Sequence, residues 1–93
     1  MSQGDTWQLR VAGPASRKIA EVLPEAVAAA VVEFITGALL ENPHRVGRPL
    51  RNELQGNHAA RRGTFRIIYR IRLDEGVVEV IDVGHRTDAY RRS

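Results

Sequence analysis

The sequence predicts an α+β domain with the element order β-α-α-β-β-β, in which two N-terminal helices pack on one face of a mostly antiparallel four-stranded sheet. Three observations support this prediction. Apolar residues recur at helical spacing over residues 24–42, and they alternate with polar residues over residues 64–73. A chain of 93 residues can build only one core, so we expect a single domain over residues 1–93.

The N-terminal part predicts one strand and two helices. Residues 7–11 alternate between apolar and polar side chains, as a short strand does. Pro14 suits the first turn of a helix, and Pro24 ends that helix and can open the next. The second helix is expected to reach Asn42, with a broad apolar stripe that fits across a sheet. Such a helix can also bind a partner, but a small domain needs it first for its core.

Residues 44–57 predict an exposed connection, because glycines, prolines and asparagines interrupt every regular pattern there. So long a connection in a small domain is often functional. It carries Arg48 and Arg51, which are candidate contacts for an anion, whereas Leu50 and Leu54 are expected to anchor the connection to the core.

The second half of the chain predicts three more strands. Residues 58–62 form the second strand, which turns at Gly63 into the third strand over residues 64–73. Residues 74–76 are Asp-Glu-Gly, a typical hairpin turn, and the β-branched run over residues 77–83 predicts the fourth strand.

The third predicted strand has two chemically different faces. Its odd-numbered residues, from Phe65 to Leu73, are all apolar or aromatic, so that face is expected to pack on the core. Its even-numbered residues include Arg66, Arg70 and Arg72. Guanidinium groups bind phosphate oxygens in bidentate pairs. This second face is therefore a candidate phosphate-binding surface, and the alternative is an ordinary solvated face.

Basic charge is concentrated in the second half of the chain. Residues 1–43 carry three basic and five acidic groups, whereas residues 44–93 carry eleven basic and six acidic groups. The net charges are therefore −2 and +5, and they add to the +3 of the whole chain. This asymmetry indicates an anionic partner for the second half, most simply a nucleic acid.

Composition argues against several classes of function. The chain has no cysteine, so it forms neither a disulfide nor a thiolate metal site. Because it also lacks Cys/His metal spacing and a glycine-rich phosphate loop, we expect no metal and no cofactor. No segment has the roughly 18 apolar residues of a membrane span, and the N-terminus lacks a signal-peptide pattern. A cytoplasmic location without a membrane partner is expected.

Three local patterns follow one another in the second half of the chain. They are Arg48-Pro49-Leu50-Arg51 leading to Gly56, the run from Arg61 to Tyr69, and Ile81-Asp82-Val83-Gly84-His85-Arg86 with Tyr90 behind it. In order and spacing they resemble the RelE/ParE superfamily of bacterial toxins, and within it the RelE-type ribosome-dependent mRNA interferases. The likeness covers nearly the whole chain. The central pattern is the most specific, because the family has basic-x-Gly-x-aromatic-Arg-aliphatic-aliphatic-Tyr there.

The resemblance implies the toxin of a type II toxin–antitoxin system, which enters the ribosomal A site and cuts the bound mRNA. In that family the RNA 2′-hydroxyl attacks the adjacent phosphate without a metal and leaves a 2′,3′-cyclic phosphate. Cleavage of the mRNA inhibits translation. The resemblance also implies a RelB-like antitoxin as a partner, besides the ribosome and mRNA, in a toxin–antitoxin complex that can be hetero-oligomeric.

The resemblance further implies individual catalytic residues. Arg66 matches the strand arginine that the family uses on the phosphate, and Arg86 matches the arginine after the last strand. Tyr90 matches the C-terminal tyrosine, which stacks on a base or orients the nucleotide. Arg61 falls on the second of two basic positions in the preceding strand, whereas Ala59 takes the first, where the family has a lysine.

Proton transfer needs a group other than arginine, whose pKa above about 12 keeps it charged. A loop glutamate that a related branch uses is replaced by Arg48. His85 and His58 are candidates by their chemistry, because imidazole titrates near neutrality, and the alternative for each is a structural role. The expected catalytic residues are Arg61, Arg66, His85, Arg86 and Tyr90. The expected RNA-binding residues are Arg48, Arg51, His58, Arg62 and Arg70. Arg62 is alternatively a contact for the antitoxin.

Two other classes of function remain open at the level of sequence. A ParE-like protein would poison DNA gyrase by binding, without chemistry of its own. An RNA-binding module would present the same arginines but lack the groups that move protons. The run of Arg61, Arg66, Arg86 and Tyr90 favours the nuclease over the first alternative, and the alanine at position 59 keeps the second alternative open.

Overall fold

Helices occupy most of the first half of the chain and strands the second half, in a computed structural model that describes residues 7–51 and 56–85. In chain order the elements are β1 (Gln8–Val11), α1 (Gly13–Arg17), η2 (Lys18–Val22), α2 (Glu25–Thr36), α3 (Ala38–Glu41), α4 (Pro43–Val46), β2 (Arg48–Pro49), β3 (His58–Arg62), β4 (Phe65–Arg72) and β5 (Val77–His85). The segment η2 is a π-helical turn that continues α1, so the two together form the first predicted helix. No described helix is long and apolar enough to cross a membrane.

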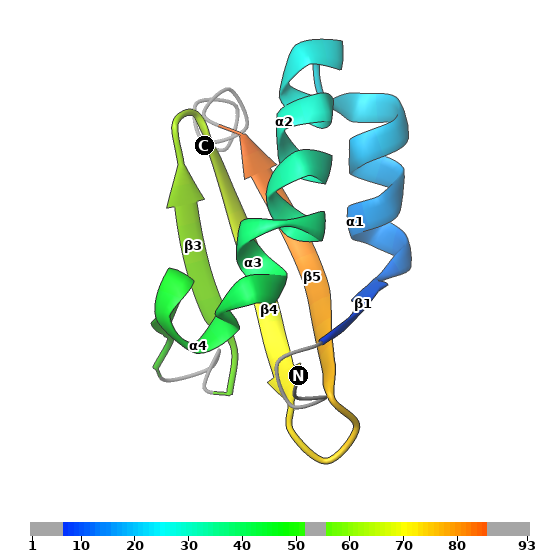
Figure 1. Cartoon of the computed structure of the whole chain (residues 1–93). Helices are drawn as coiled ribbons and strands as arrows, with labels where there is room; N and C mark the ends of the chain where they lie inside the picture. Colours follow the sequence, from blue (N-terminus) through cyan, green and yellow to red (C-terminus); the bar gives the residue numbers. More distant parts are fainter. Residues whose placement is uncertain (1–6, 52–55, 86–93) are drawn as a thin grey trace.

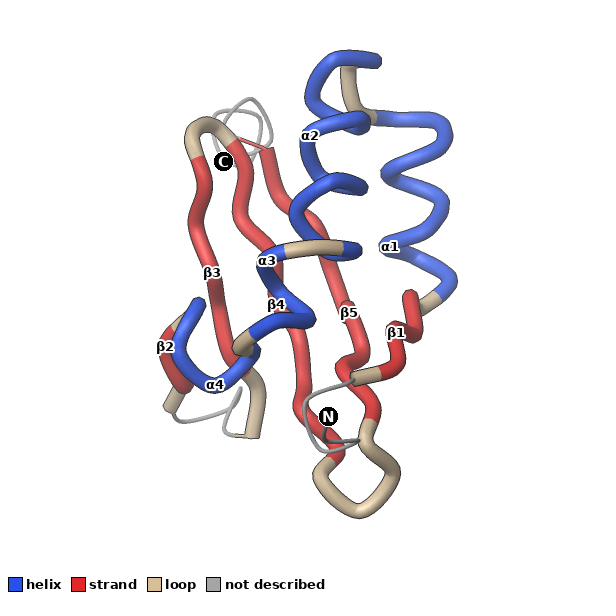
Figure 2. Tube along the Cα trace, in the orientation of Figure 1, coloured by secondary structure: helices blue, strands red, loops and turns tan. Residues whose placement is uncertain are grey.

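The strands form one sheet in the order β1-β5-β4-β3-β2, and the helices lie against one face of it (Figure 1, Figure 2). Strand β1 is parallel to β5, whereas the other neighbouring strands are antiparallel. The two long hairpins turn at Gly63 and Gly76, whose φ angles of 53° and 66° lie in the left-handed region that glycine adopts without strain. The predicted α+β class, with helices on one face of a mostly antiparallel sheet, is confirmed.

The sheet has a fifth strand that the sequence did not predict. Strand β2 pairs Arg48 with Ala59 and Pro49 with His58, and α4 precedes it. The expectation of an irregular connection over residues 44–57 is therefore wrong for its first part. A strand of two residues is too short to produce an alternating pattern, and the pairing depends on β3, which is distant in sequence.

The second predicted helix is interrupted at Gly37. Its backbone has φ −119° and ψ −95°, outside the helical region, so α2 ends at Thr36 and α3 begins at Ala38. A Cβ atom at Gly37 would lie only 3.0 Å from the carbonyl oxygen of Glu33. The apolar stripe continues across the break, because Leu39 in α3 is fully buried. The prediction that this segment fills the core is confirmed.

The core lies between the helices and one face of the sheet. Strand β4 contributes Phe65, Ile67 and Tyr69, as its alternating pattern predicts, and the ring of Phe65 meets that of Phe34 edge to face at 6.2 Å. Leu73 departs from the prediction, because β4 ends at Arg72 and leaves Leu73 in the turn, 71% exposed.

The even-numbered residues of β4 point to the opposite face, which no described element covers. Arg66 lies between Arg61 of β3 and Gly84 of β5, and Ile68 lies between Ala59 and Asp82. The register shifts next to Ile68, so that one extra residue of β5 is accommodated there. We call this surface the arginine face, and its residues are Arg48, Ala59, Arg61, Arg66, Ile68, Arg70, Arg72, Glu79, Asp82 and Gly84.

Candidate nucleic-acid interface

Arg61 and Arg66 lie directly opposite each other at the end of the arginine face next to the β3–β4 hairpin. Both side chains are exposed, and neither makes an ion pair with any described residue. Gly84 completes the arginine row (Arg61, Arg66 and Gly84), and a Cβ atom there would lie 3.8 Å from Nη2 of Arg66. The absence of a side chain at Gly84 therefore leaves the guanidinium of Arg66 open to a ligand.

The arginines of β4 that lie toward the opposite end of the sheet are held by polar partners. Arg72 Nε donates to Glu79 at 3.0 Å, and Arg70 Nε donates to the side-chain oxygen of Asn57 at 3.0 Å. At the β4–β5 hairpin, Arg10 pairs with Glu75 at 3.3 Å. Of the described arginines on the arginine face, Arg48, Arg61 and Arg66 therefore have neither a carboxylate nor an amide partner.

Arg48 enters the arginine face from β2. It lies opposite Ala59, and Ala59 lies opposite Ile68, in the row next to the arginine row. At the far side of the same row, the carboxylate of Asp82 accepts a hydrogen bond from Lys18 Nζ at 3.0 Å. Arg48 is exposed and Asp82 is half-exposed, so both ends of the row meet solvent.

His58 lies on the other side of the sheet from the arginine row. Its register partner is Tyr69, on whose ring it stacks with the centroids 5.4 Å apart and the planes 26° from parallel. Its Nδ1 atom is buried without a hydrogen-bond partner among the described residues. Burial, and secondly the neighbouring His44, lower the pKa of His58 below its ordinary value. The structure thus places His58 in the packing beneath α4 and does not bring it to Arg61 and Arg66.

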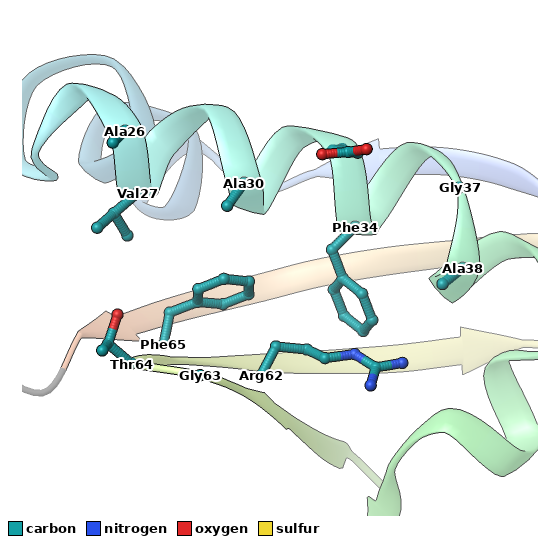
Figure 3. A pocket seen from close by; sticks show the side chains of 11 residues that line it. Ala26, Val27, Ala30, Phe34, Gly37, Ala38, Arg62, Gly63, Thr64 and Phe65 are labelled. Carbon is teal, nitrogen blue, oxygen red and sulfur yellow. The ribbon is translucent and has the colours of Figure 1, made fainter.

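Arg62 also points to the helix side, where it borders an apolar groove between α2 and the β3–β4 hairpin (Figure 3). Its guanidinium carbon lies 5.0 Å from the centre of the Phe34 ring, a cation–π contact. The groove has a volume of about 690 Å³, and its lining includes Val27, Ala30 and Phe65. Arg62 is therefore separated by the sheet from the arginine row and is not placed to bind the same anion.

The remaining predicted site residues lie near the ends of the described segments. His85 is the last residue of β5 and is paired with Phe65, so its register position is on the helix side of the sheet, with Arg62, and not in the arginine row. Arg51 is exposed just beyond β2. Arg86 and Tyr90 lie outside the described residues.

Two polar residues near the predicted set were not singled out by sequence reasoning. Asn57 is buried and orients Arg70, although an asparagine before a strand is an ordinary turn residue in sequence. Asp82 reaches the arginine face because of the irregularity beside Ile68, and period-two alternation alone does not reveal such a shift. Nothing in the sequence distinguishes Asn57 or Asp82 from residues with a purely structural role.

The arrangement is suited to binding a phosphodiester. Directly opposite residues of antiparallel strands have Cβ atoms about 5 Å apart, so Arg61 and Arg66 can contact the oxygens of one phosphate together. Among the described residues, no group of histidines and carboxylates is placed to hold a metal ion. The chemistry that these residues can supply is the stabilisation of negative charge on phosphate oxygens by guanidinium groups.

Comparison with known sequences places this chain among bacterial toxins. The family model described as the ParE toxin of the type II toxin–antitoxin system parDE matches residues 14–90. Toxin RelE of Mycobacterium tuberculosis is 45% identical over 91 residues, which cover 98% of this chain and 93% of that protein. Toxin RelG of the same organism is 49% identical over 77 residues, which cover 83% of this chain and 88% of that protein.

Solved structures show the same fold. The toxin–antitoxin complex RelBE2 from Mycobacterium tuberculosis contains a chain that superposes with a TM-score of 0.83 and 44% identity, over 87% of this chain and 99% of that one. The isolated RelE toxin of E. coli superposes with a TM-score of 0.70 and 20% identity, over 92% of this chain and 97% of that one. At that lower identity the likeness concerns the fold alone.

Proposed function

The chain belongs to the RelE/ParE family of toxins of type II toxin–antitoxin systems, and from this premise we propose that it is an endoribonuclease that cleaves mRNA in the ribosomal A site. The observation that carries the proposal is the arginine row. Two guanidinium groups face solvent side by side there, without a carboxylate partner among the described residues, beside a glycine that leaves them accessible.

The proposed reaction is a transesterification within the RNA. The 2′-oxygen of one nucleotide attacks the adjacent phosphorus, the bond from phosphorus to the 5′-oxygen breaks, and a 2′,3′-cyclic phosphate and a 5′-hydroxyl remain. Negative charge builds up on the non-bridging oxygens as the phosphorus becomes five-coordinate. Arg66, assisted by Arg61, would stabilise that charge by paired hydrogen bonds. Binding that strengthens as the charge develops accelerates the step.

Two protons must also move, one from the 2′-hydroxyl and one to the departing 5′-oxygen. We assign proton transfer to His85 on its chemistry, because an imidazole can both accept and donate a proton, whereas its register position opposite Phe65 is on the helix side of the sheet, next to the arginine row and not in it. His58 is held within the packing, with its ring stacked on Tyr69 and its Nδ1 atom buried, which argues against it as the proton acceptor. Arg86 and Tyr90, which follow His85 in the chain, complete the proposed catalytic set.

A RelB-like antitoxin is the proposed partner of the free toxin. The related chains of Mycobacterium tuberculosis and E. coli were solved in RelBE toxin–antitoxin complexes. An acidic segment of the antitoxin laid over the arginine face would neutralise the arginine row and block RNA at the same time. Because the attraction is electrostatic, such binding should weaken as salt increases.

Mapping the 5′ ends of cellular RNA after brief expression of the chain tests the proposal. We expect new 5′-hydroxyl ends within translated regions, phased with the codons, and none in messages whose start codon has been removed. Expression of the Arg66→Ala variant at the same level is the control and should give few such ends. Intact messages accompanied by gyrase-dependent DNA breaks would instead establish the ParE-like function. Stable RNA binding without new ends would establish a non-cleaving module.

A further inference from the structure

Strand β2 delivers an arginine to the arginine face beside Ala59, the one residue that β3 presents on that face without a cation. Arg48 is the register partner of Ala59. The next residue, Ala60, is only 2% exposed and packs in the core, so Ala59 and with it Arg48 point to the side of Arg61 and Arg66. The short strand, which the sequence did not predict, is what places this side chain.

The position of β2 is fixed on both sides of Arg48. After it, the Leu50 N–H donates to the carbonyl of Asn57 at 2.8 Å. Before it, Gly47 packs so closely that a Cβ atom there would lie 2.6 Å from both the Ala59 carbonyl oxygen and the Tyr69 hydroxyl oxygen. Arg48 is therefore presented by a segment held against β3 rather than by a loose loop.

Tyr69 holds the start of the same segment from within the core. Its buried hydroxyl donates to the carbonyl of Pro43 at 2.6 Å, and burial raises the pKa of Tyr69, so the hydroxyl remains a donor at physiological pH. The segment from Pro43 to Arg48 is thus held in place by Tyr69 of β4, the strand that also carries Arg66.

The sheet register sets how close Arg48 comes to the arginine row. Arg61 lies two residues beyond Ala59 on β3, so Arg48 and Arg61 are diagonal neighbours, roughly 7–8 Å apart at the backbone and within reach of long side chains. Across the sheet, Ala59 lies between Arg48 of β2 and Ile68 of β4, and it places only a methyl group there. Arg48 is exposed and makes no ion pair with a described residue.

We propose that Arg48 is a phosphate-binding residue of the cleavage site and supplies from β2 the cation that β3 lacks at Ala59. This inference rests on the proposed function and names its ligand, a backbone phosphate of the single-stranded message beside the one held by the arginine row. A strand of RNA lying across β2, β3 and β4 would then meet Arg48, Arg61 and Arg66 in succession.

A rescue experiment tests this role. Single-turnover cleavage on programmed ribosomes is measured for the wild type, Arg48→Ala, Arg48→Ala/Ala59→Lys and Arg48→Ala/Ala29→Lys. The last variant restores the same net charge on an exposed position of α2, away from the site. We expect Arg48→Ala to slow cleavage by about 10- to 100-fold, the size of a charge-assisted contact, and only the lysine at position 59 to restore the rate to within about 3-fold.

A second readout separates this inference from the proposed function. The same four proteins are titrated with a single-stranded RNA oligonucleotide that carries 2′-deoxy substitutions and is not cleaved. A plot of log affinity against log salt concentration has a negative slope, and loss of one phosphate contact should make it shallower by about 0.7. The lysine at position 59 should restore the slope of the wild type. If the wild type does not cleave, the proposed function fails, while the slopes still decide whether Arg48 binds phosphate.

Two results would overturn the inference. One is an Arg48→Ala variant with the cleavage rate and salt slope of the wild type. The other is equal recovery with the lysine at position 29 or at position 59, because net charge rather than place would then account for the effect. Thermal unfolding of each variant, expected within a few degrees of the wild type, shows that the comparison is between folded proteins.

Discussion

At the scale of single residues, the useful distinction among the arginines is whether a carboxylate lies beside them. Two arginines directly opposite on neighbouring strands repel each other and destabilise the sheet. Arg72 lies opposite Val77 and pairs with Glu79, whereas Arg61 and Arg66 face each other without an ion pair to any described residue. A pair of this kind gains its stabilising counter-charge when an anion binds, which favours a functional role.

Arg66 and Arg72 provide a matched pair of variants, because both lie on β4 and on the same face. We expect Arg66→Ala to slow single-turnover cleavage by about 10²- to 10³-fold, the range found for removing one donor that stabilises a developing oxyanion. Arg72→Ala removes the same charge from the strand but only a contact to Glu79, so cleavage should stay within about 3-fold of the wild type. Equal losses in the two variants would show that general electrostatics, rather than the arginine row, governs the rate.

His58 gives a prediction about stability and pH. Burial lowers its pKa in the folded protein, so the unfolded chain takes up a proton more readily once the pH falls below the ordinary value of 6.5. Stability should therefore be retained above that pH and lost as the pH falls through it. We expect the thermal midpoint of the wild type to fall between about pH 7.5 and about pH 5.5 more than that of His58→Phe. The phenyl ring keeps the stacking on Tyr69 without a titratable nitrogen, and parallel pH curves would contradict the assignment.

At the scale of elements, periodicity predicted what depends on long, regular patterns. The alternation of β4 and the helical stripe of α2 follow from local spacing, and both pack as expected. The break at Gly37, the end of β4 before Leu73 and the strand β2 could not be predicted, since each depends on contacts with residues distant in sequence. Strand alternation predicted the face on which Arg66 lies, whereas the position of Arg61 and Gly84 beside it depends on the register.

The same limit explains the separation of the candidate site into two groups. Residue types suggested His58 and Arg62 as RNA contacts, because both are cationic or titratable and lie in the same strand as Arg61. The face that each residue occupies depends on register, and register places these two, and also His85 opposite Phe65, on the helix side of the sheet. Residue chemistry thus identifies candidates, but the register decides which of them can meet one ligand.

The close contact at Gly47 gives a prediction for β2. A methyl group there would overlap the carbonyl oxygen of Ala59, a backbone atom of β3 that cannot move without disturbing the sheet. We expect Gly47→Ala to lower the free energy of unfolding by about 1–3 kcal/mol, as overpacked sites do. Urea denaturation measures this change. An unchanged unfolding free energy would mean that β2 is not held against β3 as described.

At the scale of the whole molecule, the unequal charge of the two halves should govern association. The second half carries eleven basic and six acidic residues, and its strands present the arginine face. Complementary charge mainly raises the rate of encounter. We therefore expect the association rate with the antitoxin to fall by about 10-fold or more between about 50 mM and about 200 mM salt, with a smaller change in the dissociation rate. Stopped-flow mixing measures both, and a salt-independent association rate would contradict the electrostatic account.

Within residues 7–51 and 56–85, the short outer strands leave two lengths of sheet margin unpaired. Strand β1 pairs with Val77 to Val80 only, and beyond it Lys18 Nζ donates to the carbonyl of Val83 at 3.1 Å, where a foreign strand would otherwise bond. Strand β2 pairs only with the first two residues of β3, so the remainder of that margin carries Arg61 and Arg62. Charged side chains at open sheet margins discourage aggregation. The positive charge proposed to bind RNA should therefore also oppose edge-to-edge pairing between copies of this chain.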